Sequence, residues 1–213
     1  MLYVRTLCLL ACLLPCVSGN TPPDFRRTVI MFESRASPKE PVFVRGGVFY
    51  GRRKGCYTAP SLDVNPCAIP IRHKNYTGSY IEQPYNDWSI GDNYLDWIGA
   101  EPTQSSWREI LPEGSPTIST SNIKKSNKYH VLNTYGEGYW LLDVEMDCSK
   151  TVNGFFEVKA FLNHEFEYDI DQDKMCSGAY AMRKPFTSRS HVGMCGAKNV
   201  FYINYGACEV TWL

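Results

Sequence analysis

The apolar residues of the chain gather in short runs that predict β-strands. Residues 27–32 (RTVIMF) and 41–50 (PVFVRGGVFY) are rich in β-branched and aromatic side chains, which favour strands. The glycine pair inside the second run indicates a bulge, a tight bend or a close approach of backbone. Two more strand-forming regions are predicted at residues 151–163 and 199–212.

The clearest strand is predicted at residues 139–146 (YWLLDVEM), where apolar and acidic side chains alternate. One face carries Leu142, Val144 and Met146, and the other carries Asp143, Glu145 and, just beyond, Asp147. Such alternation is typical of a strand with one face on the core and the other in solvent. The Asn-Gly pair at 153–154 then predicts a hairpin turn into the next strand.

The remaining segments show weaker patterns. Residues 67–73 (CAIPIRH) are extended in character, but their proline excludes a central place in a sheet. Residues 101–127 are rich in Ser, Thr and Pro, which predicts loops. We find no amphipathic helix of about 12 residues or more. Short strands separated by turns predict a mostly β fold, a disulfide-stabilised antiparallel β-sandwich in a single domain.

The first nineteen residues predict an export signal. Arg5 provides a positive start, residues 7–17 an apolar middle, and Val17-Ser18-Gly19 a small-residue cleavage site. The expected mature chain, residues 20–213, is one secreted β-sandwich domain with a C-terminal cysteine-rich extension at residues 176–213. No later run reaches about 18 apolar residues, so a membrane-spanning helix is not expected.

The expected mature chain is close to neutral. Removal of Arg5 leaves 21 basic against 22 acidic side chains. This balance predicts neither a nucleic-acid partner nor attraction to an anionic membrane surface.

Two features fit an exported chain. Three of the nine cysteines leave with the signal, and the six that remain are Cys56, Cys67, Cys148, Cys176, Cys195 and Cys208. An even number in an exported chain predicts three disulfides, for which many pairings are open. Our hypothesis is Cys56–Cys67, Cys176–Cys195 and Cys148–Cys208. Asn75-Tyr76-Thr77 also predicts glycosylation of Asn75.

No arrangement of residues predicts catalysis, so we do not expect an enzyme. The four histidines are scattered along the chain. Acids on one strand lie side by side instead of flanking a substrate, so a hydrolase would have to depend on Asp143 or Glu145. No cofactor is expected. Residues 169–174 (DIDQDK) leave a weak calcium site open, although they lack the glycine and the final glutamate of an EF-hand.

Residues 86–107 (NDWSIGDNYLDWIGAEPTQSSW) hold three of the five tryptophans among acidic side chains. Trp and Tyr stack on the flat C–H faces of sugars, while carboxylates and amides bond the hydroxyls at the rim. The segment therefore predicts a ligand-binding platform formed by Trp88, Asp92, Asn93, Tyr94, Trp97, Glu101 and Trp107. Trp88 and Tyr94 are expected to face outward with Asp92 and Asn93, and Trp97 to be half-buried. The alternative is that tryptophans, Trp97 or Trp140 above all, fill the core.

Four short motifs add a resemblance to a known family. They are VFVRGG (42–47), GDNYLDW (91–97), YWLLDVEM (139–146) and FFEVKAFLN (155–163). In this order, over residues 28–171, they resemble starch-binding-type carbohydrate modules, which are immunoglobulin-like β-sandwiches attached to α-amylase-like enzymes. The resemblance implies a carbohydrate-binding sandwich. The chain departs from the family in its cysteine-bounded insert at 56–67, and the family's binding tryptophans do not map onto Trp88, Trp107 or Trp140.

The expected function is therefore a secreted, non-catalytic, lectin-like module that binds a glycan or glycoprotein through exposed aromatic side chains. The alternative is an extracellular matrix or structural protein, associated with calcium or mineral. Calcium-dependent self-association without sugar binding would favour that alternative.

Overall fold

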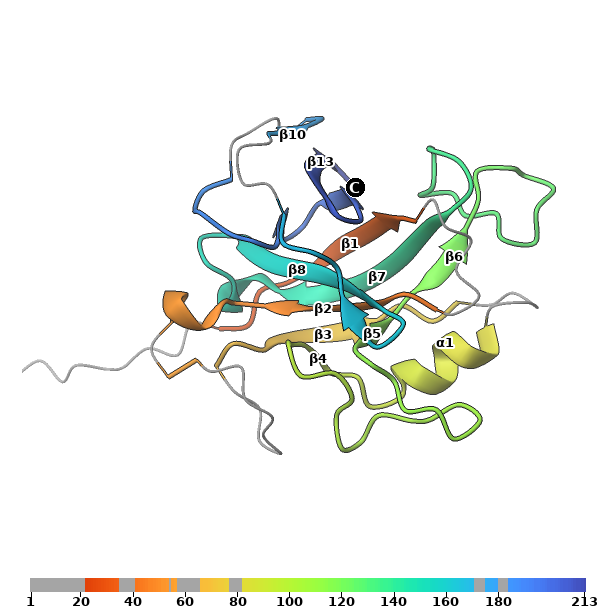
Figure 1. The fold of residues 1–213 in the computed structure, drawn as a ribbon, viewed down its shortest axis with the longest axis horizontal. Coiled ribbons are helices and arrows are strands. Elements are labelled where there is room, and N and C mark those ends of the chain that lie inside the picture. Colours follow the sequence, from red (N-terminus) through yellow and green to blue (C-terminus); the bar gives the residue numbers. More distant parts are fainter. Residues whose placement is uncertain are drawn as a thin grey trace, which may run out of the picture.

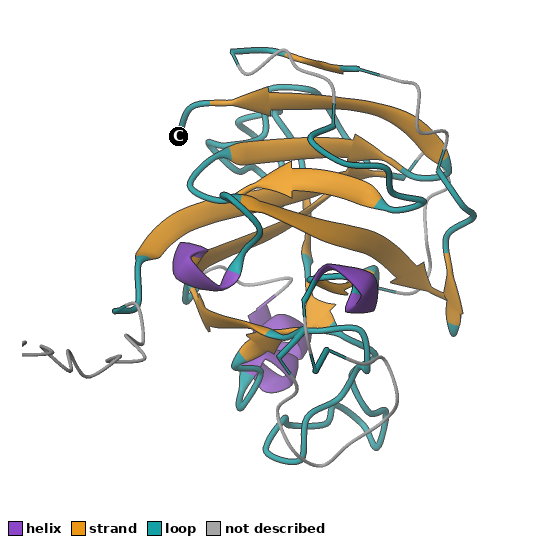
Figure 2. Cartoon of the chain, turned by 90° about the vertical axis from the view of Figure 1, so that its left-hand side faces the viewer, coloured by secondary structure: helices purple, strands orange, loops and turns teal. Residues whose placement is uncertain are grey.

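The computed structural model describes residues 22–34, 41–53, 55–56, 66–76, 82–170, 175–179 and 184–213. These residues form two β-sheets and short helical segments in one β-rich domain (Figure 1). Figure 2 shows the strands gathered together, with the helical turns below most of them in that view. The expected export signal, residues 1–19, lies outside the described residues.

One sheet contains eight strands in the order β10-β13-β12-β1-β7-β3-β4, with β6 also paired to β7. Its strands are β1 (Phe25–Glu33), β3 (Ile69–His73), β4 (Tyr94–Leu95), β6 (Ile118–Thr120), β7 (Tyr139–Asp147), β10 (Cys176–Ser177), β12 (Lys198–Tyr202) and β13 (Tyr205–Thr211). The pairs β1–β12 and β10–β13 are parallel, and the other described pairs of this sheet are antiparallel.

The second sheet contains five strands in the order β11-β8-β2-β5, with β9 paired to β8. Its strands are β2 (Phe43–Gly47), β5 (Ser115–Pro116), β8 (Phe155–Leu162), β9 (Glu165–Phe166) and β11 (His191–Met194). The helical segments are the 3-10 turns η1 (Tyr50–Arg52) and η2 (Cys148–Lys150) and the helix α1 (Glu82–Ser89), which lies beside β5 (Figure 1).

The main hydrophobic core joins the two sheets. The period of two in each strand sends alternate apolar side chains to this core, so β1 and β7 supply Ile30, Phe32, Leu142, Val144 and Met146. The five-stranded sheet supplies Val44, Phe156, Val158 and Ala160, and Val42, directly before β2, joins them. Burial of each larger apolar side chain stabilises the fold by about 1.5–3 kcal/mol. Trp140 is half-buried against this core, in line with the alternative considered for it.

The expectation of a solvated acidic face on β7 is wrong for two of its three acids and holds for Glu145, whose side chain is 40% exposed. Asp143 and Asp147 are each only 2% exposed. Strand β7 lies between β1 and β3, and Leu141 on its outer face belongs to a second cluster of buried side chains with Val29 and Met31 of β1 and Tyr85 of α1. Asp143 is paired with Arg27 through two bonds of 3.0 and 2.7 Å, so its charge is compensated within the fold.

Strand β3 shows how a proline can lie between two strands, where we did not expect one. Pro70 pairs with Tyr94 of β4, while pairing with β7 begins one residue later at Ile71. The missing N–H of the proline therefore falls where the ladder with β7 has not yet begun. The region expected to form loops, 101–127, likewise contains the two short strands β5 and β6.

Two of the three expected disulfide pairings are wrong. Cys56 is bonded to Cys67 as expected, but Cys148 is bonded to Cys195 and Cys176 to Cys208. Cys176 and Cys208 are register partners on the parallel strands β10 and β13, with their Cα atoms 4.4 Å apart. Such pairing depends on strand register, which sequence separation does not reveal. Residues 176–213 are also not an appended extension, because β12 pairs with β1 and β11 pairs with β8.

Candidate ligand-binding pocket

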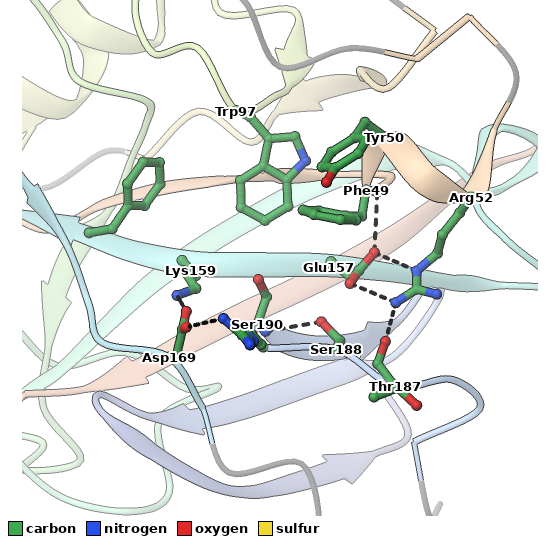
Figure 3. A pocket seen from close by; sticks show the side chains of 12 residues that line it. Phe49, Tyr50, Arg52, Trp97, Glu157, Lys159, Asp169, Thr187, Ser188 and Ser190 are labelled. Carbon is green, nitrogen blue, oxygen red and sulfur yellow. Dashed lines mark hydrogen bonds and ion pairs between the residues drawn. The ribbon is translucent and has the colours of Figure 1, made fainter.

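A pocket of about 540 Å³ opens over strand β8, bounded by segments that are far apart in the sequence (Figure 3). Its lining residues are Phe49, Tyr50, Arg52, Trp97, Glu157, Lys159, Phe166, Asp169, Thr187, Ser188, Arg189 and Ser190. In Figure 3, Phe49, Tyr50 and Trp97 lie on one side, and Lys159, Asp169 and Ser190 lie on the other. The pocket thus combines an aromatic wall with a charged and polar wall.

The aromatic wall consists of Phe49, Tyr50, Trp97 and Phe166. Phe49, Tyr50 and Phe166 are 37%, 54% and 41% exposed, which is high for such apolar rings. The ring centroids of Phe49 and Tyr50 are 4.3 Å apart. Trp97 is half-buried, as expected from its sequence, and its ring centroid lies 6.4 Å from that of Phe166. Exposed rings gathered around one cavity form a surface suited to a flat apolar ligand face.

The end of β2 places the first two rings. Gly47 has φ +129°, and a Cβ there would lie 2.4 Å from the carbonyl oxygen of Cys67. Only glycine permits this close approach of backbone. A close approach was one of the three interpretations of the glycine pair. Val48 follows as a core residue, and its carbonyl oxygen accepts a 3.4 Å bond from Nε1 of Trp97. The same turn therefore carries Phe49 and Tyr50 and holds Trp97 through this bond.

A buried ion pair fixes the floor beneath Phe49 and Tyr50. Glu157 of β8 is 1% exposed, and its carboxylate accepts bonds of 2.8 and 3.2 Å from the guanidinium of Arg52. The backbone N–H of Phe49 donates to the same carboxylate at 3.2 Å. Arg52 also lies over the ring of Phe186 at 3.7 Å and donates to the carbonyl oxygen of Thr187. This pair joins η1, β8 and the segment that precedes β11.

The opposite wall contains three charged side chains. Nζ of Lys159 lies 3.0 Å from one carboxylate oxygen of Asp169, and Nη1 of Arg189 lies 3.3 Å from the other. These contacts lower the pKa of Asp169 below its ordinary value, and the hydrogen bond from Lys159 makes the largest contribution. Asp169 therefore carries a negative charge at neutral pH. Its side chain is 59% exposed and Arg189 is 76% exposed, so both reach the solvent of the pocket.

The structure brings only Trp97, of the expected binding residues, into this pocket. Trp88 is 2% exposed, so the expectation that it faces outward is wrong. It packs at 5.0 Å against Phe43 and at 5.6 Å against the half-buried Trp107, in a cluster that also contains Phe161. These two tryptophans cover the outer face of the five-stranded sheet and are packing residues.

The polar residues of the expected platform are bonded to other parts of the protein and do not line the pocket. Asp92 is 3% exposed, contrary to expectation, and lies 2.6 Å from Nε2 of His73. Asn93 is exposed, and its N–H donates to the carboxylate of Glu101 at 3.0 Å. Burial, with smaller contributions from Asp92 and other acids, raises the pKa of Glu101 to about 8. Tyr94 is half-buried in β4.

Sequence reasoning missed most of the pocket. Phe49 and Tyr50 follow the glycine pair after one intervening residue, Val48, and this glycine pair was a local signal for a turn near two aromatic residues. Phe166 and Arg189 gave no comparable signal, because they reach the pocket through the pairing of β9 with β8 and through the segment before β11.

The sequence also left open a calcium site at residues 169–174 and predicted glycosylation of Asn75. Asp169 begins the expected calcium segment, whose residues 171–174 lie outside the described residues, as does Thr77 of the glycosylation sequence. Asn75 is exposed. Among the described residues, no group of three or more His, Cys, Asp or Glu side chains is placed to hold a metal ion. No helix in the described chain has the length and apolar character needed to cross a membrane.

Comparisons with models of protein families, with curated protein sequences and with solved structures found no match. The resemblance to starch-binding-type modules therefore stays a prediction from the sequence.

Proposed function

We propose that the protein is a secreted carbohydrate-binding module and that the pocket over β8 is its sugar site. The observation that carries this proposal is the gathering of exposed aromatic rings opposite a wall of charged and hydroxyl groups. Three disulfides support the extracellular part of the proposal, because such bonds persist in oxidising compartments.

The chemistry of a sugar ring matches the two walls. Its C–H face is apolar and packs on rings such as those of Tyr50 and Trp97, while its hydroxyls bond to polar partners such as Asp169 and Arg189. Small-molecule sites typically measure about 300–1,000 Å³, and the pocket of about 540 Å³ is within that range. The proposed function agrees with the one inferred from residues 86–107, but it is assigned to a different surface.

The first test is a glycan-array screen of the glycosylated protein recovered from the culture medium, with calcium and with a chelator. Glycans that bind are then measured by calorimetry against Trp97→Ala and Tyr50→Ala. We expect each variant to lose about tenfold or more in affinity, because central aromatic contacts dominate such interfaces. Both variants are checked for an unchanged circular dichroism spectrum.

Tyr205→Ala is the matched control for Tyr50→Ala. Both tyrosines are 54% exposed, but Tyr205 belongs to β13 and does not line the pocket. Equal losses in the two tyrosine variants would show that the pocket is not the binding site. A blank array in both conditions, with self-association that depends on calcium, would favour the matrix or structural alternative.

A further inference from the structure

The charges of the described residues that line the pocket do not cancel. Among them, three cationic side chains, Arg52, Lys159 and Arg189, face two carboxylates, Glu157 and Asp169. The whole chain has a formal net charge of zero, so the one excess positive charge among these described residues is a local property. The three cations differ in how far their hydrogen-bonding capacity is already used.

Arg52 and Lys159 are occupied by the fold. Arg52 forms its two-bond pair with the buried Glu157, donates to Thr187 and is only 20% exposed. Nζ of Lys159 donates to Asp169 and to the carbonyl oxygens of Glu167 and Tyr168, and its side chain is 12% exposed. Three contacts satisfy the three N–H groups of Lys159, and three of the five N–H groups of Arg52 are bonded within the fold, so both side chains offer little to a ligand.

Arg189 is open. In the described part of the chain, its guanidinium forms the 3.3 Å pair with Asp169, and its side chain is 76% exposed. A guanidinium has five N–H donors, so most of those on Arg189 point to solvent. Asp169 is also bonded to Lys159, which means that its charge is shared by two cations and does not neutralise Arg189 alone.

We propose, building on the carbohydrate-binding function above, that the pocket prefers sugars that carry an anionic substituent and that Arg189 binds this substituent. A carboxylate, as in a uronic or sialic acid, and a sulfate ester both offer the paired oxygens that the planar fork of a guanidinium recognises. The aromatic wall then packs against the face of the same sugar ring, so that opposite walls of the pocket bind the ring and its anionic substituent.

The test compares three forms of one oligosaccharide: the neutral parent, a form with a terminal carboxylate and a form with a sulfate ester. Affinities are measured by calorimetry at low and at high sodium chloride. We expect at least one anionic form to bind about tenfold more tightly than the parent, because charge-assisted bonds are the strong ones. High salt should reduce this advantage. The tighter of the two anionic forms identifies the substituent.

Arg189→Gln is expected to remove the preference for the anion, so that the anionic forms bind no more than about twofold more tightly than the neutral parent does to the same variant. Arg26→Gln is the matched control, because Arg26 is 62% exposed and pairs with the single carboxylate of Asp24, outside the pocket. It should keep the full preference.

The two proposals fail in different ways. If parent and anionic forms bind equally, and Arg189→Gln changes neither, the preference for anions is overturned while carbohydrate binding stands. If none of the three forms and no glycan on the array binds, the proposed function and this inference both fall. Equal losses in Arg189→Gln and Arg26→Gln would show general attraction of charge and would also overturn the role of Arg189.

Discussion

Two aromatic groups in this molecule have similar compositions and opposite roles. Trp88 and Trp107 lie in a segment rich in acids and glycines, yet they pack with Phe43 and Phe161 on the outer face of the five-stranded sheet. Phe49 and Tyr50 come from an apolar run, yet they are exposed at the pocket. The polarity of neighbours in sequence therefore does not reveal exposure, because a short helix can turn one ring inward while its polar neighbours face solvent.

The largest expected effect that separates the two groups is the stability of Trp88→Ala. Removal of a ring that is 2% exposed leaves a cavity beside Phe43 and should lower the free energy of unfolding by about 3–5 kcal/mol. Urea unfolding followed by circular dichroism measures this loss. Weaker sugar binding with unchanged stability would instead restore Trp88 to the binding platform.

The next largest effect on stability is expected for the ion pair between Arg52 and Glu157, which lies beneath the aromatic residues of the pocket. Arg52→Gln leaves the carboxylate of Glu157 buried without its cation and should reduce the free energy of unfolding by about 2–3 kcal/mol. The double variant Arg52→Gln/Glu157→Gln should recover part of this loss, because no unpaired charge then remains. A loss in the single variant below that of the exposed pair variant Arg26→Gln would contradict a structural role for the pair.

A smaller effect should appear in the pH dependence of the expected platform. The pKa of Glu101 is raised to about 8 in the fold from an ordinary 4.5, so the folded state binds this proton more firmly than the unfolded state does. The stabilisation is complete below about pH 4.5 and is lost as pH rises through about 8. Burial raises the pKa of Asp96 too, which acts in the same direction.

Urea midpoints of the parent protein and of Glu101→Gln, measured at about pH 5, 6.5 and 8, span this titration and test the dependence. The stability of the parent relative to the variant should fall steadily with rising pH. A constant difference over the whole range would show that Glu101 does not titrate in this window.

The smallest stability effect is expected for Tyr50→Ala. Its ring is 54% exposed, so the free energy of unfolding should change by no more than about 0.5 kcal/mol. The same urea series used for Trp88→Ala measures it. A loss as large as that of Trp88→Ala would erase the distinction between a packing group and a binding group.

Strand patterns predicted much of the fold. The strand at 139–146 and the run at 27–32 correspond to β7 and β1. The turn at 153–154 does precede β8, but β7 and β8 belong to different sheets and are not paired, so the predicted hairpin between them is wrong. The Cys56–Cys67 pair was within reach because the two residues are close in sequence. Cys148–Cys195 was out of reach because it joins the ends of β7 and β11, which belong to different sheets.

Local sequence determined what depends on neighbours along the chain: the period of two that forms β1, β7 and β8, and the glycine pair that permits the close approach after β2. Tertiary structure alone decided which strands pair, which acids are buried and which rings meet. Phe49, Trp97 and Arg189 form one pocket only because strand pairing brings three distant segments over β8. These contacts join residues that are far apart in sequence, and their energies depend on the tertiary structure. A local sequence pattern therefore does not predict them.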